Sequence, residues 1–209
     1  MSTSFTQVRL HPIGEVSDPH HIRAIGVLWG RISPDWSIIL TGGFHGKSLT
    51  IRPEAFGLIQ KLVKRGVDSA LFVVWPRTRN GFVASLEVIG VWKPSILDPD
   101  SGAQDDLPEG ENWFSIRGEV CHKVWWDQEY GPRVSVKVFG EHFVTVDFDP
   151  TQVKLYQGDF VSLDAILTVD GRLRAEWVKK ISIPEPAVAR PHQGSRPGRQ
   201  VRRRSSAVN

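Results

Sequence analysis

The sequence is poor in several features that mark particular classes of protein. Only one of its 209 residues is cysteine, so no intramolecular disulfide can form, which fits a reducing compartment. The longest apolar runs fall far short of the ~20 residues that a membrane helix needs. The first residues lack the apolar segment of a secretory signal. We therefore expect a cytoplasmic protein with no membrane partner.

Catalytic and metal-binding motifs are also scarce. The segment 42–48 resembles a phosphate-binding loop, but it has one residue too few between its first glycine and the Gly-Lys pair, and a predicted strand follows it. Cys121 and His122 are neighbours on a predicted strand, so they face opposite sides and are badly placed to share a proton. His20 and His21 lack a third ligand nearby. We expect no enzyme, no metal and no cofactor.

Charge of a single sign is confined to two stretches. The chain holds 26 Lys and Arg against 23 Asp and Glu. Residues from Arg190 onward include six arginines and no acid, whereas residues 94–112 include six acids and no base. The pI near 9.2 therefore comes largely from the tail, and the rest of the chain is only mildly basic. Net charge alone gives no argument for a nucleic-acid partner.

The sequence is rich in short alternating runs, and these are clearest over residues 113–183. Alternation of apolar and polar residues is the pattern of a half-buried strand, because successive side chains point to opposite faces. Asp170-Gly171 predicts a two-residue type I′ hairpin turn. Five strands in about 70 residues favour a small closed barrel, since an open sheet would leave its edges unpaired. The predicted strands are 114–124, 133–140, 142–149, 160–169 and 172–181.

A similar order of elements precedes this region, over residues 21–93. A helix is predicted over Pro53–Arg65, with proline in its first turn and Gly66 after its end. Asn80-Gly81 predicts a second type I′ turn. The apolar stripe of the helix is expected to be Phe56, Ile59, Leu62 and Val63. The predicted strands of this region are 22–32, 36–41, 47–51, 70–75 and 82–92.

The two regions form a weak internal repeat. Gly26 and Gly118 are 92 residues apart, and so are Gly66 and Gly158, while the two hairpin pairs are 90 apart. A repeat of one supersecondary unit indicates two domains rather than one large one. The predicted organisation is a flexible arm, a first unit, an acidic linker, a second unit and a disordered Arg-rich tail, over residues 1–20, 21–93, 94–112, 113–183 and 184–209.

This order of elements resembles the OB-fold, a five-stranded Greek-key barrel. The family places a helix between strands three and four, where this chain has Pro53–Arg65 in one copy and the short segment Pro150–Gly158 in the other. Gly26 and Gly118 lie where such a barrel bends. The resemblance implies an all-β fold of two tandem barrels, with one helix in the first. It also implies a ligand face on strands two and three, flanked by the loops after strands one and four.

The second unit has the better candidate for that face. If its valines point inward, then Arg133, Lys137 and Phe139 point outward, and Phe143, Thr145 and Asp147 do so on the next strand. Cations beside exposed aromatics suit single-stranded nucleic acid, because phosphates need charge and bases need flat partners. The loop after the first strand adds Trp125, Trp126 and Tyr130. The remaining candidate binding residues are Arg77, Arg79, Arg202, Arg203 and Arg204.

The leading interpretation is a non-enzymatic protein that binds single-stranded DNA or RNA through the second barrel and the arginine tail. An alternative is that the aromatic residues have a structural role, either closing one end of the barrel or contacting the first half. In that case the tail only confers solubility. The rival function is that of an adaptor which docks on a larger protein or ribonucleoprotein complex. Both faces of the strand over residues 82–92 are apolar, which suggests that the first unit packs against another body.

Overall fold

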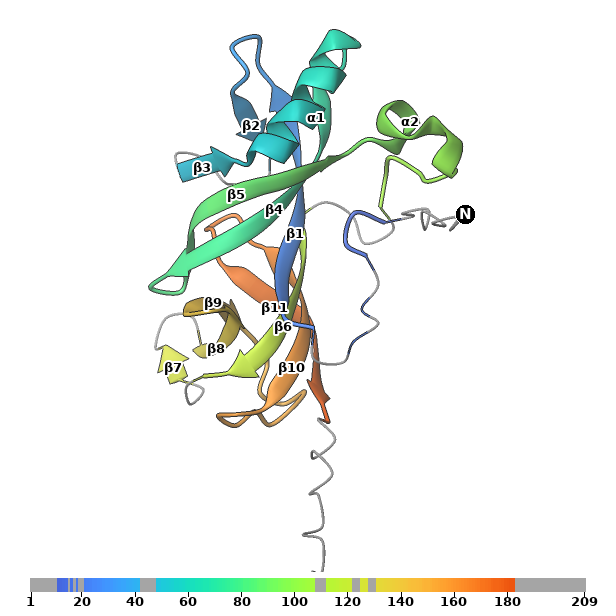
Figure 1. Ribbon diagram of the computed structural model, residues 1–209. Helices are drawn as coiled ribbons and strands as arrows, with labels where there is room; N and C mark the ends of the chain where they lie inside the picture. The colour runs from blue at the N-terminus through green and yellow to red at the C-terminus, as the bar shows by residue number, and fades with distance from the viewer. Residues whose placement is uncertain are drawn as a thin grey trace, which may run out of the picture.

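The computed structural model consists mainly of β-strands, as the alternation predicts (Figure 1). The structure describes residues 11–14, 16, 18, 21–41, 48–107, 112–121 and 131–182, together with the backbone of 125–127. The strands of the second half are β6 (Trp113–Val120), β7 (Trp125–Asp127), β8 (Gly131–Phe139), β9 (His142–Asp147), β10 (Phe160–Leu167) and β11 (Leu173–Ile181). All of them except β7 lie close to predicted strands.

Five of these strands close into the barrel that was predicted for residues 113–183. The order around the barrel is β6, β8, β9, β11, β10 and back to β6, with β9 and β11 parallel and every other pair antiparallel. Val134, Val136, Val144 and Val146 point into its core, as predicted. No helix forms over residues 148–159, so the predicted short connection between β9 and β10 is also present.

Closure of the barrel depends on Gly118. A Cβ atom at this position would lie 1.9 Å from the backbone oxygen of Lys137, because β6 and β8 approach one another closely there. The neighbouring pairs Glu119–Lys137 and Val120–Val136 are the ones that join the two strands. The role of Gly118 is therefore to leave room between β6 and β8, so that the barrel can close, rather than to bend β6.

The first half contains β1 (Arg23–Ile32), β2 (Ile38–Leu40), β3 (Ser48–Ile51), α1 (Pro53–Lys64), β4 (Ser69–Arg79) and β5 (Phe82–Trp92). Its pairings repeat four of the five barrel pairings: β1 with β2, β1 with β4, β4 with β5, and β3 parallel to β5. A pairing of β2 with β3 does not occur among the residues that the structure describes. The described part of this half is therefore a curved sheet, with α1 packed on β5.

The predicted helix is present, but its buried face is shifted. Ala55, Ile59 and Leu62 are buried, whereas Phe56 is exposed and makes a tilted contact with Trp36. The prediction that Phe56 belongs to the buried stripe was therefore wrong. The small Ala55 takes that place because α1 lies close to the sheet.

The two halves are joined into one continuous sheet by β1 and β6 (Figure 1). The two strands are antiparallel, with Gly26 opposite Phe114 and Ala24 opposite Ile116. A Cβ atom on Gly26 would meet the Phe114 ring at 2.2 Å, so a larger residue here would require the ring to shift. Ala24 and Ile116 are 92 residues apart, so they are equivalent positions in the two copies of the repeat. The two halves are therefore joined at a point where the same position of each copy pairs with the other.

The outer face of the first sheet is covered by the chain itself. Val27 and Val73 form a small second core with Ile13, and Leu107 and Trp113 pack against it. Further contacts hold the segment after β5, which includes α2 (Pro94–Leu97) and the 3-10 turn η1 (Pro99–Ser101). The Trp92 indole donates to the Gln104 carbonyl at 2.9 Å, and the Lys93 ammonium lies 2.7 Å from the Asp105 carboxylate. Residues 94–107, the described part of the predicted linker before residue 112, thus pack against the first half.

The two predicted hairpin turns have different outcomes. Asn80 and Gly81 both have positive φ, of 54° and 83°, which is the predicted type I′ turn. At the other turn, positive φ is found at Gly171 but not at Asp170, and the Gly171 N–H donates to the Thr168 carbonyl. That connection is a three-residue loop with glycine in the left-handed position, so the predicted two-residue turn was wrong.

Neither helix of the described chain has the length and apolar character to cross a membrane.

Candidate functional site

The expected ligand face, on β8 and β9, is partly covered by the β4–β5 hairpin. The hydroxyl of Thr78, on β4, accepts a hydrogen bond from the Thr145 N–H at 3.0 Å and donates to the Phe143 carbonyl at 3.2 Å. At the tip of the hairpin, the Val83 N–H donates to the Gly171 carbonyl at 2.8 Å. Ser135 and Thr145 are consequently buried, although they lie on the outer side of the barrel.

Arg133 lies beneath this hairpin and not in solvent. Its side chain donates from Nε to Asp147 Oδ1 at 2.9 Å, and its guanidinium lies 5.8 Å from the centre of the Phe82 ring. A Cβ atom on Gly81 would come within 2.4 Å of its Nη1 atom. With only 3% of its surface exposed, Arg133 does not point into solvent as the alternation predicted. The correction arises because a distant hairpin covers the outer face of β8.

Asp147 is the centre of a buried charge network at this contact. It also accepts from Arg172 Nη1 at 2.6 Å, and Arg172 donates in turn to Asp170. Burial raises the pKa of the Asp147 carboxyl, and the charges of Arg172 and Arg133 oppose that rise. Two cations on one carboxylate allow the charges to be buried together. All of these charged side chains belong to the barrel, and the hairpin packs over them through Phe82 and Gly81.

The end of the face beyond the hairpin remains open to solvent. Lys137 is exposed, Phe143 is 40% exposed and Phe139 is 67% exposed. Lys137 and Phe143 are cross-strand partners, and Phe139 pairs with His142. Three of the four candidates on this face are therefore accessible, and they are gathered at one end of it.

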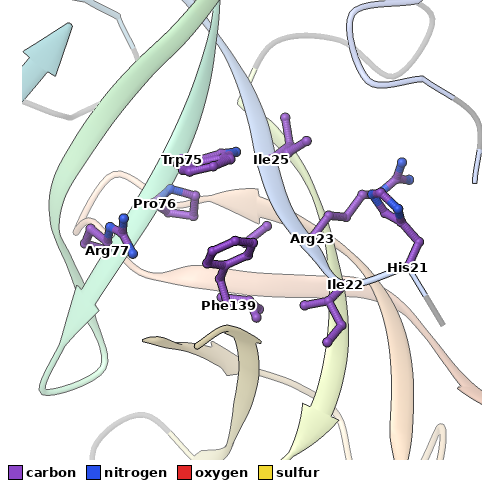
Figure 2. Close-up of a pocket in the computed structure, with 10 residues that line it drawn as sticks. His21, Ile22, Arg23, Ile25, Trp75, Pro76, Arg77 and Phe139 are labelled. Atoms are coloured by element: carbon purple, nitrogen blue, oxygen red, sulfur yellow. The ribbon is translucent and has the colours of Figure 1, made fainter. Parts of the chain in front are cut away.

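That open end borders a cavity of about 220 Å³ between the two halves (Figure 2). Three segments line it: residues 21–25 at the start of β1, residues 75–77 on β4, and Val138 and Phe139 at the end of β8. Figure 2 shows Trp75 and Phe139 on opposite sides of the space. The β1–β4 pairing ends at Gly26 and Val74, and the cavity lies where both strands continue beyond that pair.

The aromatic walls come from different halves. The ring centres of Trp75 and Phe139 are 6.2 Å apart, and their planes are inclined at 32°. Trp75 is further held by the Arg52 guanidinium, 4.2 Å from its ring centre. Arg52 donates to Glu87 at 2.7 Å, which fixes it in place. Phe139 has no such support and is far more exposed, so it is the more adaptable wall.

Cations lie at the sides of the cavity. Arg23 donates from Nε and Nη2 to the Ser115 hydroxyl and from Nη1 to the Gly14 carbonyl, so its guanidinium is fixed. Burial, and then the charge of Arg117, lower the pKa of Arg23. Arg77, a predicted site residue, also lines the cavity, 3.7 Å from the Glu87 carboxylate. Arg52 and Arg77 share the acid Glu87, whereas Arg23 lies near Arg117 and Asp164.

Several predicted site residues lie elsewhere or beyond the described residues. Arg79 is exposed near the hairpin tip and does not line the cavity. Residues 125–127 form β7, which pairs with β8, where a loop had been predicted. The side chains of Trp125 and Trp126 lie outside the described residues, as do Tyr130 and the tail arginines 202, 203 and 204.

The sequence alone missed part of this cavity. Trp75 precedes Arg77 by two residues on one strand, so alternation could have placed both on the same face. Arg23 and Arg52 carry no comparable signal, because their positions depend on the β1–β6 pairing and on Glu87.

Burial raises the pKa of the Cys121 thiol, which lowers its reactivity. The described residues contain no group of three or more His, Cys, Asp or Glu that could hold a metal ion.

The chain matches no protein-family model, and no curated protein resembles it closely enough to be identified as a relative.

Proposed function

We propose that this protein binds single-stranded nucleic acid without catalysing a reaction, and that the strand crosses the junction between its two halves. The observation that carries the proposal is the junction cavity, where Trp75 and Phe139 face each other between Arg23 and Arg77. Exposed aromatic faces stack on bases and cations attract phosphates, which is the combination that single strands require. Phe143 and Lys137 extend the same surface along the open end of β8 and β9.

Some of the candidate binding residues take other roles than the sequence suggested. Lys137 and Arg77 contact phosphates, and Phe139 stacks on a base. Arg133 contributes to the fold instead, because it is buried against Asp147. Trp125, Trp126, Tyr130 and the tail arginines keep the binding roles proposed from the sequence.

The finer description of the fold belongs to the same proposal. We propose that residues 21–93 and 113–183 are two copies of one OB-like unit, flanked by a flexible arm and an Arg-rich tail. The four shared strand pairings and the self-pairing of Ala24 with Ile116 support this interpretation. In such a tandem, the second copy supplies Phe139 and the first supplies Trp75.

The rival adaptor function has less support. It was suggested by the two apolar faces of β5, which would need a covering body. Among the described residues, Ile13, Leu107 and Trp113 already cover the outer side of that sheet. A partner protein is therefore not needed to explain the apolar pattern.

A salt titration tests the proposal. Binding of labelled oligo(dT) or oligo(U) should weaken as salt rises, because each phosphate contact releases counterions and contributes about −0.7 to the slope of log K against log salt. R77A and K137A should each make the slope shallower by about 0.7. R31A, which removes an exposed arginine at the other end of β1, should leave it unchanged. Absence of binding by the full chain at low salt would refute the proposal.

Removal of the tail gives a separate test. A chain that ends before Arg190 lacks six arginines, so its salt slope should be shallower than that of the full chain. The effects of R77A and K137A should persist in the shortened chain, since those residues belong to the folded part. Equal slopes for the full and the shortened chain would show that the tail makes no phosphate contact.

A further inference from the structure

The junction cavity has the size of a site for one ring system. Its volume of about 220 Å³ is below the ~300 Å³ at which pockets for drug-sized ligands begin. Apart from the aromatic walls, the lining includes Ile22, Ile25 and Val138, which are apolar. The ligand that enters must therefore be small, flat and largely apolar on its faces, as a nucleobase is.

We infer that one unpaired base is inserted between Trp75 and Phe139, so that each half of the protein provides one side of a stacking slot. This inference rests on the proposed function and specifies how the strand is held. Stacked bases repeat every ~3.4 Å, so a base between two rings needs their centres about 6.8 Å apart. The observed separation is 6.2 Å, and the exposed Phe139 can move outward to provide the difference.

The two arginines of the lining determine how the nucleic-acid strand runs past the slot. Arg23 and Arg77 enter the lining from β1 and β4, where they can meet the phosphates on either side of the inserted base. The guanidinium of Arg23 is already fixed by Ser115 and Gly14, so little side-chain freedom is lost on binding. The apolar side chains of the lining pack against the base, and the slot therefore requires one.

The test compares oligo(dT) of about 12 nucleotides with a sugar-phosphate chain of equal length that has no bases. This length is within the ~4–16 nucleotides that one such fold covers. Fluorescence anisotropy of the labelled strand measures both affinities without relying on tryptophan emission. Wild-type protein should prefer oligo(dT), and the one base held in the slot should contribute about 5- to 150-fold to that preference.

Variants measure the contribution of the slot. F139A and W75A should lose most of that contribution, whereas W75F should retain part of it, which shows that an intact fold is being measured. F56A and W177A are the controls, because they remove another exposed phenylalanine and another exposed tryptophan, both outside the cavity lining. Both controls should keep the wild-type preference.

The possible failures are distinct. If neither strand binds to wild-type protein at low salt, both the proposed function and the proposed slot are wrong. If both strands bind equally well, nucleic acid is held by its backbone and the slot is wrong. If F139A and W75A keep the full preference for bases, stacking occurs elsewhere and the slot is again wrong, although the proposed function stands.

Discussion

Replacing Asp147 by alanine is expected to lower the free energy of unfolding by about 3–5 kcal/mol, the usual effect of removing one partner from a buried ion pair. The carboxylate accepts from Arg133 and Arg172, and all three side chains lie largely out of solvent. Without it, two guanidinium charges remain close together beneath the hairpin. Urea unfolding followed by circular dichroism measures the change, and an unchanged m value would show that the unfolding transition is comparable.

Two further variants test the cause of this loss. One removes the charge but keeps the volume of the side chain, and the other breaks an ion pair that is exposed at the surface. D147N keeps the size of the side chain, so it should lose a similar amount if the charge is what matters. E176A breaks the ion pair with Arg174, whose side chains are more than half exposed, and should cost no more than about 1 kcal/mol. A loss below about 1 kcal/mol in D147A would contradict the role assigned to this network.

The second large effect is expected at Gly118. G118A should lower the free energy of unfolding by about 3 kcal/mol, at the upper end of the range for overpacking. The added Cβ would lie 1.9 Å from the Lys137 carbonyl oxygen, and a backbone atom cannot rotate away as a side chain can. Relief of this clash requires β6 and β8 to separate, which opens the barrel where it closes.

G57A is the matched control for this glycine substitution. Gly57 lies within α1, and a Cβ atom there would meet nothing within 4 Å. Alanine is the better helix former, so G57A should raise stability by up to about 1 kcal/mol. Opposite signs for two Gly→Ala changes in one chain would attribute the G118A effect to crowding. A G118A protein as stable as the wild type would refute the close approach of β6 and β8.

Local patterns in the sequence predicted much of the fold. Period-two alternation located the strands of the barrel, since Val134, Val136, Val144 and Val146 must share one face if every second side chain points inward. Proline and glycine marked both ends of α1. The type I′ turn at Asn80-Gly81 was equally legible, because few residue pairs tolerate two successive positive φ angles. Each of these features depends on residues within a few positions of one another.

The candidate site was predicted less completely, because its members come from segments that only tertiary structure brings together. Phe139 and Arg77 were selected separately from two halves, and nothing local indicated that they line one cavity. Alternation correctly placed Arg133 outside the barrel core, but outside the core did not mean exposed, because the β4–β5 hairpin covers that surface. The partner of a strand face cannot be inferred from the strand alone.

The sequence by itself determined the strands, the helix and the closed barrel of residues 113–183, because backbone geometry and burial act on neighbouring side chains. Tertiary structure alone decided that β1 pairs with β6, that the hairpin lies across β8 and β9, and that Trp75 meets Phe139. Those contacts join residues about 65 to 90 positions apart, and their energies depend on shape and charge at surfaces that exist only once both halves have folded.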